Sequence, residues 1–439
     1  MQLIVDSIIE FMTYLASLGN FLMMPLVFTV LCLILGMNVL DAVRNSVKIG
    51  IGFIGFTLVN DLVVRTIGPA VASMAELRGV TLNTVDFGWA AVSTIAYATE
   101  LGALMIIFAL IFNIVLVLLK VTKTLDVDLW NYWQFALTGS FVMLVADSFW
   151  LGLIAALLQM LITLWIADAS AEMIQKYINL PNISIAHAFA SIIWLMAYPI
   201  AKFWELIGWK SRKWDSSKKD VGSAFQKFVD PVIIGLIIGL AIGTLGYAGA
   251  GLGFREAFKK ILGVGMVSAS MIILNPKAVS VLLDGINPIS EQARKVLLSK
   301  LAKDGRTLYI GVDSAVMIQD EITLIVSSLL IPISILIAAI LPGNTLIPFA
   351  GLTGLIYLIC TIAPLVKGDL LKLLATSIII LAAMIGLGSN WAPEVTRLVS
   401  ENGLALPAET AQVSFMANPL TWVMVVVARF INNVRFLLS

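Results

Sequence analysis

LGALMIIFALIFNIVLVLL, residues Leu101 to Leu119, is the stretch that decides the fold class. It holds no charged residue, and a run of about 20 apolar residues is long enough to cross a bilayer as one helix. In hydrocarbon every backbone N–H and C=O must be satisfied within the segment, which favours a helix over an isolated strand. The stretch therefore predicts a membrane-spanning helix.

Comparable apolar runs recur along the whole chain. The clearest are Phe21 to Met37, Leu101 to Leu119, Phe141 to Ile166, Pro231 to Leu245, Ile322 to Leu341, Leu346 to Val366, Leu370 to Leu387 and Leu420 to Leu438. The 439 residues are 60% hydrophobic and 13% charged, whereas soluble domains are roughly 45–50% apolar and about 25% charged. We expect an all-α integral membrane protein with about ten to twelve transmembrane helices, including re-entrant segments.

Charge and cysteine content exclude several classes of function. A net charge of +1 without basic clusters beside aromatic platforms gives no case for nucleic-acid binding. Cys32 and Cys360 lie far apart inside apolar runs, so we expect buried small residues and neither a disulfide nor a metal site. No metal or other cofactor is expected.

Basic residues orient the bundle, because cytoplasmic loops collect Lys and Arg. Two basic loops, Lys202 to Lys227 and Arg294 to Arg306, are expected in the cytoplasm. The acidic stretch from Asn390 to Gln412 suits an outer loop. The same scheme places Arg255, Lys259 and Lys260 outside or at a helix mouth, and the charge rule gives no reason for basic residues there.

The two halves of the chain resemble each other in the order of their segments. Pro25 in MMPLVFTVLCLILGM matches Pro231 in VDPVIIGLIIGLAIG, and further matches follow in the same order. Because counterpart loops fall on opposite sides of the membrane, the repeat is interpreted as inverted. We expect a first repeat at residues 1–225, with its basic cytoplasmic loop, and a second at 226–439.

Polar residues occur just ahead of two long spans, where they are costly and usually face a cavity. STIAYATELG ends near Glu100, and its counterpart IGVDSAVMIQDEIT carries Asp313, Gln319 and Asp320. Such segments are typical of broken or re-entrant helices, so we predict that these four residues bind substrate. Acids also favour helix N-termini, so at least one of Asp320 and Glu321 is expected to cap its helix.

Two further segments supply candidate site residues. Gln134 lies in WNYWQFALTG, and His187 in SIAHAF has Asn418 as a loose counterpart in the second half. An imidazole can move protons near neutral pH, whereas Gln134 suits a helix-to-helix hydrogen bond equally well. We predict that Gln134, His187 and Asn418 bind substrate and that His187 and Asp313 have catalytic roles.

Several of these segments together resemble a known family. They are KIGIGFIG, IGPAVASMAE, DVDLWNYWQFALTGS, DGINPISEQAR, IGVDSAV and IPISILIAAILPGNTLIPF. The chain resembles, over nearly its whole length, the galactitol-type IIC membrane component of the bacterial phosphoenolpyruvate-dependent phosphotransferase system, in the ascorbate/galactitol superfamily. It departs from the family pattern at Gln134, where a histidine is expected, and after IGVDSAV, where QDE stands in place of Gly-His. These departures leave the sugar open.

The resemblance implies a homodimeric, multi-pass carrier of the bacterial inner membrane that imports a sugar or polyol and releases it phosphorylated. The phosphate would come from a separate cytoplasmic IIB protein, so the phosphate-donor residue would lie on another chain. Substrate contacts are implied at Gln134, His187 and Asp313. An ion-coupled secondary transporter of a small polar solute, with Glu100, Asp313 and Asp320 as proton or sodium sites, is the alternative that the residues leave open.

Overall fold

The structure is a computed structural model that describes most of the chain. The described residues are 20–78, 84–86, 92–93, 95–97, 99–210, 231–301, 307–317, 320–346, 348, 351, 354–401, 410–412 and 417–438. The predicted site residue Gln319 lies outside them.

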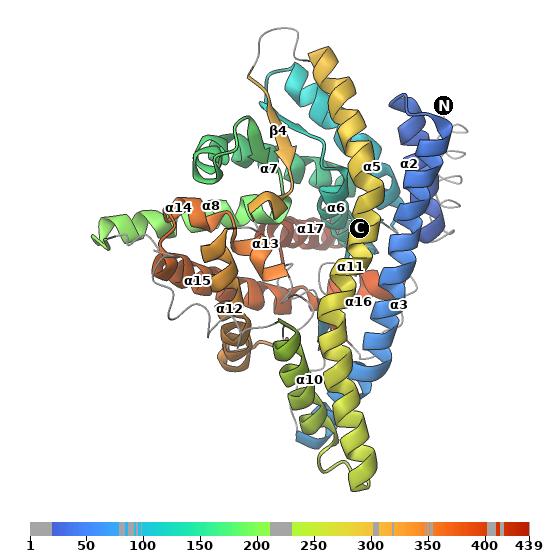
Figure 1. The fold of residues 1–439 in the computed structure, drawn as a ribbon, viewed down its shortest axis with the longest axis vertical. Helices are drawn as coiled ribbons and strands as arrows, with labels where there is room; N and C mark the ends of the chain where they lie inside the picture. The colour runs from blue at the N-terminus through green and yellow to red at the C-terminus, as the bar shows by residue number, and fades with distance from the viewer. Residues whose placement is uncertain are drawn as a thin grey trace.

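Long helices form a column along one side of the molecule (Figure 1). They are α2 (Asn20–Ile34), α3 (Val39–Arg78), α10 (Pro231–Tyr247) and α11 (Phe254–Leu301). α3 and α11 are antiparallel neighbours, because Gly285 lies against Asn45 while Gly55 lies against Ala278. A Cβ at Gly285 would come 2.4 Å from the Asn45 carbonyl oxygen, so glycine is what allows this close helix contact.

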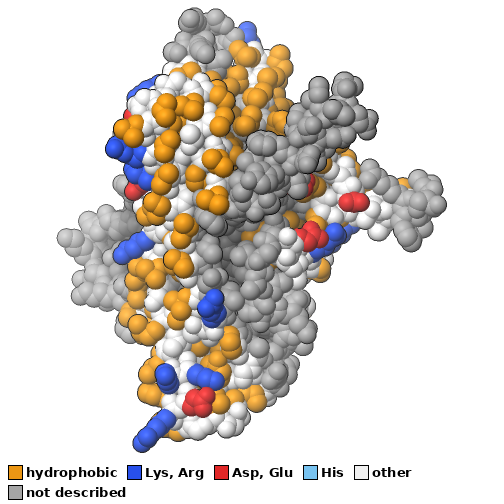
Figure 2. All heavy atoms as spheres, turned by 90° about the vertical axis from the view of Figure 1, so that its right-hand side faces the viewer, with side chains coloured by type: hydrophobic (Ala, Val, Ile, Leu, Met, Phe, Trp, Pro, Cys, Tyr) orange, Lys and Arg blue, Asp and Glu red, His pale blue; other side chains and the backbone are white. Residues whose placement is uncertain are grey.

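The outward face of this column is apolar (Figure 2). Exposed large side chains follow one another along α2 and α3, namely Leu26, Val30, Leu33, Val43, Val47, Ile51, Ile54, Leu58 and Leu62. A row of exposed apolar side chains along two helices is typical of contact with lipid or with another protein. The column therefore has the surface that a membrane protein requires.

The remaining helices pack into a rounder body beside the column. They are α5 (Glu100–Leu118), α6 (Trp133–Ala146), α7 (Phe149–Ile178), α8 (Ala188–Leu206), α12 (Glu321–Ile340), α13 (Leu355–Ile359), α14 (Ile362–Leu365), α15 (Leu370–Asn390), α16 (Ala392–Glu401) and α17 (Pro419–Leu438). Side chains cap several N-termini: Thr99 caps α5, Ser148 caps α7 and Asp369 caps α15. The predicted runs starting at Leu101, Ile322, Leu370 and Leu420 are confirmed as single helices.

Two small parallel sheets join segments that are far apart in the sequence. β1 (Thr84–Asp86) pairs with β5 (Thr410–Gln412). In the other sheet β4 (Tyr309–Val312) lies between β2 (Thr124–Asp126) and β3 (Ile183–Ile185). The chain is mostly helical, as predicted, but it is not all-α, because these strands were not expected.

Two of the predicted spans are wrong as single helices. The run from Phe141 to Ile166 breaks between α6 and α7, where Asp147 has a left-handed φ of 48° and the extended Ser148 accepts the Leu151 N–H at 3.4 Å. The run from Leu346 to Val366 holds only the short helices α13 and α14 within its described residues. An apolar composition does not register such turns, because the turning residues are few and the flanks stay hydrophobic.

Among the described residues, two helices are long and apolar enough by themselves to cross a membrane. They are α7, Phe149–Ile178, and α15, Leu370–Asn390. The expected number of about ten to twelve spans stays a prediction.

Candidate functional site

The three-stranded sheet gathers side chains from both halves of the chain at one edge. Its strands are parallel, with Asp126 of β2 opposite Gly311 of β4 and Ile185 of β3 opposite Val312 of β4. Because the carboxyl ends of parallel strands meet at the same edge, the residues that follow each strand emerge together. Asp128 follows β2, Asp313 follows β4 and His187 follows β3.

Hydrogen bonds connect these side chains into one network. The Asn131 amide nitrogen, in the short 3-10 helix η1 (Leu129–Tyr132), donates to Asp128 Oδ2 at 2.6 Å and to Asp313 Oδ2 at 2.9 Å. The Asn131 oxygen accepts from Gln134 Nε2 at 3.0 Å, and Gln134 Nε2 lies 2.9 Å from His187 Nε2. We call Asp128, Asn131, Gln134, His187 and Asp313 the central network.

The members of the central network differ in burial. Asn131, Gln134 and His187 are buried, whereas Asp128 and Asp313 are only half-buried. The two acidic residues are therefore the more exposed members of the network. Carboxylate oxygens accept hydrogen bonds strongly, so this end of the network suits the hydroxyl groups of a sugar.

His187 is held in a setting that favours the neutral imidazole. Its Nδ1 caps α8 by accepting the Ala190 N–H at 3.2 Å, while its Nε2 faces the amide nitrogen of Gln134. Gln134 keeps this orientation because its oxygen accepts the Phe189 N–H at 3.3 Å. A neutral imidazole has one acceptor nitrogen and an imidazolium has none. The neutral ring can therefore accept a hydrogen bond from only one of these two donors, and a protonated ring from neither.

Asn418 lies beside the central network and hydrogen bonds to backbone. Its amide nitrogen donates to the Ala188 carbonyl at 3.2 Å, and its oxygen accepts the N–H groups of Leu420 at 2.9 Å and Thr421 at 3.4 Å. It thus ties the start of α17 to the start of α8, next to His187. Asn418, which was predicted to be the counterpart of His187, lies directly before α17, as His187 lies directly before α8.

Two other predicted positions lie in different surroundings. Asp320 caps α12, where its Oδ2 accepts the Thr323 N–H at 3.0 Å, and its Oδ1 accepts the Tyr177 hydroxyl at 3.0 Å. The expectation that an acid caps this helix is confirmed for Asp320. Glu100 lies in the first turn of α5 with an exposed side chain, in contrast to the buried amides of the central network.

The sequence analysis did not single out Asp126 and Asp128 as site residues. Both lie in the DVDLWNYWQF segment, and alternate residues of an extended chain face the same side. Asp126 is buried and its Oδ1 accepts the Asp128 N–H at 3.1 Å, which fixes the turn from β2 into η1. The sequence pattern that could have indicated them is a pair of acidic residues, one position apart, just before the polar start of a helix.

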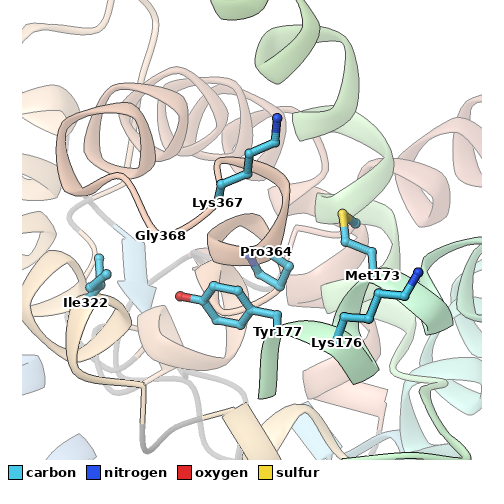
Figure 3. A pocket seen from close by; sticks show the side chains of 7 residues that line it. All are labelled: Met173, Lys176, Tyr177, Ile322, Pro364, Lys367 and Gly368. Atoms are coloured by element: carbon cyan, nitrogen blue, oxygen red, sulfur yellow. The ribbon is translucent and has the colours of Figure 1, made fainter. Parts of the chain in front are cut away.

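A cavity of about 430 Å³ lies elsewhere, between the end of α7, the start of α12 and the turn before α15 (Figure 3). It is lined by Met173, Lys176, Tyr177, Ile322, Pro364, Lys367 and Gly368. Lys367 pairs with Glu205 at 3.3 Å and Lys176 with Glu172 at 4.0 Å, so neither cation is in excess. No member of the central network lines this cavity.

Comparison with known proteins identifies the family of the chain. The profile of a family described as "PTS system sugar-specific permease component" (EIIC-GAT) matches residues 14–409. An Escherichia coli K12 protein named "Putative permease IIC component" is 32% identical over 405 residues, covering 92% of this chain and 90% of that protein. The galactitol-specific EIIC component of the same strain is 29% identical over 418 residues, covering 95% and 90%. The chain therefore belongs to the family of PTS sugar-specific permeases, whose members lie in the inner membrane and carry sugars together with other components of that system.

Proposed function

We propose that the protein imports a galactitol-like polyol or sugar and releases it phosphorylated, with the phosphate supplied by a separate phospho-IIB protein. The central network is the observation that carries this proposal, because two half-buried carboxylates and two amides converge at one sheet edge. The similarity to a galactitol-specific EIIC component over 95% of the chain supports the class of substrate.

In this proposal the sugar replaces its hydration shell with hydrogen bonds to the central network. Its hydroxyl groups donate to Asp128 and Asp313, which the buried Asn131 amide holds together, and Gln134 stays a predicted substrate contact. His187 lies beside Gln134, and Asn418 holds the start of α8. We assign Asp320 a capping role, while Glu100 and Gln319 stay predicted substrate contacts.

Asp313 is the better proton acceptor of the two predicted catalytic groups. During transfer the sugar hydroxyl oxygen forms a bond to phosphorus, the bond from phosphorus to the partner's donor atom breaks, and the hydroxyl proton must leave. Asp313 is half-buried and can accept that proton, whereas His187 faces N–H donors at both nitrogens. We therefore propose Asp313 as the base and His187 as a group that caps α8 beside Gln134.

We also propose that residues 1–225 and 226–439 form two inverted repeats. Each half has a short helix followed by a very long one, α2 with α3 and α10 with α11, and later a strand ahead of a long helix. If β1 corresponds to β4 and β5 to β3, the pairing of β1 with β5 maps onto the pairing of β4 with β3. The multi-pass topology and the homodimer, with the apolar face of the column against lipid or a second copy, belong to the same proposal.

The decisive experiment uses the purified protein in proteoliposomes with labelled galactitol outside. We expect uptake that requires phospho-IIB and yields galactitol phosphate inside. An ion gradient that drives accumulation of unmodified galactitol without IIB would overturn the proposal in favour of a secondary transporter. Asp313→Asn should abolish galactitol binding in a protein that still folds, and unchanged affinity in that variant would remove Asp313 from the site.

A further inference from the structure

β2 is an edge strand, and its outer backbone edge requires partners. Within the part of the chain that the structure describes, the strand order β2-β4-β3 leaves one side of β2 without a neighbouring strand. Thr124, Leu125 and Asp126 are all buried, so an unpaired N–H or C=O on that side would cost free energy. Nearby side chains supply the partners.

Asn113 of α5 takes the place of the missing strand. Its amide nitrogen donates to the Thr124 carbonyl at 3.0 Å, and its oxygen accepts the Asp126 N–H at 2.9 Å. One amide therefore satisfies two of the outward-facing backbone groups of β2, while the Thr124 N–H donates to Thr122 Oγ1 and the Asp126 carbonyl accepts the Tyr132 hydroxyl. Asn113 is fully buried, and it is the polar residue within the apolar stretch from Leu101 to Leu119.

Asp168 of α7 holds the entry to the same strand. Its Oδ2 accepts the Thr122 hydroxyl at 2.9 Å and the Lys123 N–H at 2.8 Å, and its Oδ1 accepts the Thr124 hydroxyl at 2.7 Å. Thr124 Oγ1 also lies 2.8 Å from Ser184 Oγ of β3. The contacts thus run from α7 through β2 to the strand that precedes His187.

We propose that Asn113 and Asp168 are positioning residues of the substrate site. They fix β2 in register, and β2 delivers Asp126 and Asp128 to the sheet edge, where Asn131 bridges Asp128 to Asp313. Neither residue belongs to the central network. The expected effect of these two residues on transport rests on the proposed function, whereas their expected effect on the position of β2 does not.

A cross-linking experiment tests the geometry without any sugar. Both Asp128 and Asp313 hydrogen bond to the same nitrogen of Asn131, so cysteines at these two positions lie within reach of a short bifunctional thiol reagent. Asp128→Cys and Asp313→Cys are combined with Cys32→Ala and Cys360→Ala in the full chain. Cross-linking is then compared with and without Asn113→Leu or Thr124→Val, where the second variant removes only hydroxyl contacts and preserves the shape of the residue.

Asn344→Leu is the matched control. Asn344 also binds backbone, through the Ala338 and Leu346 carbonyls, but at the opposite end of α12 from Asp320. We expect the cross-linking yield to fall about tenfold with Asn113→Leu and by less with Thr124→Val, and to be unchanged with Asn344→Leu. Equal yields in all variants would overturn the positioning role.

The same substitutions in the otherwise native protein give the functional readout. Asn113→Leu should raise the KM for galactitol about tenfold with a smaller change in kcat, because the carboxylates that receive the sugar are displaced. Unaltered KM in a variant whose cross-linking yield has fallen would also contradict the role in substrate positioning. The cross-linking yields could change as expected while phospho-IIB fails to phosphorylate galactitol on the wild-type protein. In that case the proposed function is wrong, but the role of Asn113 in positioning β2 is retained.

Discussion

Asp313 and His187 lie in one network, but their surroundings suit them to different tasks. Asp313 is half-buried and shares the Asn131 amide with Asp128, whereas both nitrogens of His187 face N–H donors. The imidazole is thus engaged by two protein donors, whereas the Asp313 carboxylate lies at the half-buried end of the network.

Substitutions of the two residues separate these tasks. His187→Asn keeps a good N-cap for α8, so we expect a folded protein that retains at least roughly a tenth of the wild-type kcat/KM. Asp313→Asn removes the proposed base and should lower kcat/KM about a hundredfold or more. The measurement is transfer of labelled phosphate from phospho-IIB to galactitol. A His187→Asn protein that loses as much activity as Asp313→Asn would show that the imidazole takes the proton.

Asp320 provides a second test at single-residue scale. Its carboxylate caps α12 and accepts the Tyr177 hydroxyl, so Asp320→Ala should lower stability by about 1 kcal/mol and leave galactitol affinity unchanged. Asp320→Asn keeps a capping oxygen and should lose less. Thermal unfolding in detergent and equilibrium binding give the two readouts. A large loss of affinity in Asp320→Asn would instead return this residue to the substrate site.

Part of the site could be predicted from the types and context of its residues. Polar side chains inside apolar segments pointed to Gln134, His187 and Asp313, and the structure brings these three together. Asp128 was missed because its importance comes from a strand of three residues paired with a segment almost two hundred positions away. No periodicity can be read over three residues, so such strands give no local signal.

At the scale of elements, helix extent was predictable where apolar runs end in capping residues. The stretch from Leu101 to Leu119 closely matches α5, and Leu370 to Leu387 lies within α15. The break at Asp147 was not predictable from hydropathy, because a left-handed residue followed by a cap interrupts the helix without interrupting the apolar surface. Asn113 is a different case. This single polar residue in an apolar helix hydrogen bonds to the backbone of the strand β2 beside it.

The packing of α6 on α7 depends on two glycines that face each other. A Cβ at Gly152 would come 2.6 Å from the Gly139 carbonyl oxygen and 2.7 Å from Met143 Cβ. Gly152→Ala should therefore force the helices apart and destabilise the protein by about 1–3 kcal/mol. Gly263→Ala in α11 is the control, since a Cβ there meets nothing within 4 Å and alanine is the better helix former.

Thermal unfolding in detergent compares the two glycine variants. We expect a lower midpoint for Gly152→Ala and an equal or higher midpoint for Gly263→Ala. Equal midpoints for both variants would show that α6 and α7 can separate without cost. Because α6 carries Gln134, galactitol affinity should fall together with the stability of Gly152→Ala.

At the scale of the whole molecule, the long helices constrain how the chain lies in the bilayer. α11 has 48 residues, and a helix of that length extends about 72 Å at 1.5 Å per residue, against roughly 30 Å for the hydrocarbon core. It must tilt steeply or extend beyond the core at its ends. Arg255 lies at one end of α11 and Arg294 close to the other, so the basic residues near Arg255 need not enter hydrocarbon.

This geometry predicts the sides on which single cysteines can be labelled. Lys202 and Lys367 both pair with Glu205, so the end of α8 and the turn before α15 lie on the same side of the molecule. We expect Lys202→Cys and Lys367→Cys to react with a membrane-impermeant maleimide only from the cytoplasm, and Arg255→Cys only from outside. Labelling uses intact cells and inverted vesicles, with a Cys32→Ala, Cys360→Ala background as the blank. Reaction of Arg255→Cys from the cytoplasm would contradict the inverted arrangement of the halves, since α10 and α11 would then begin on the wrong sides.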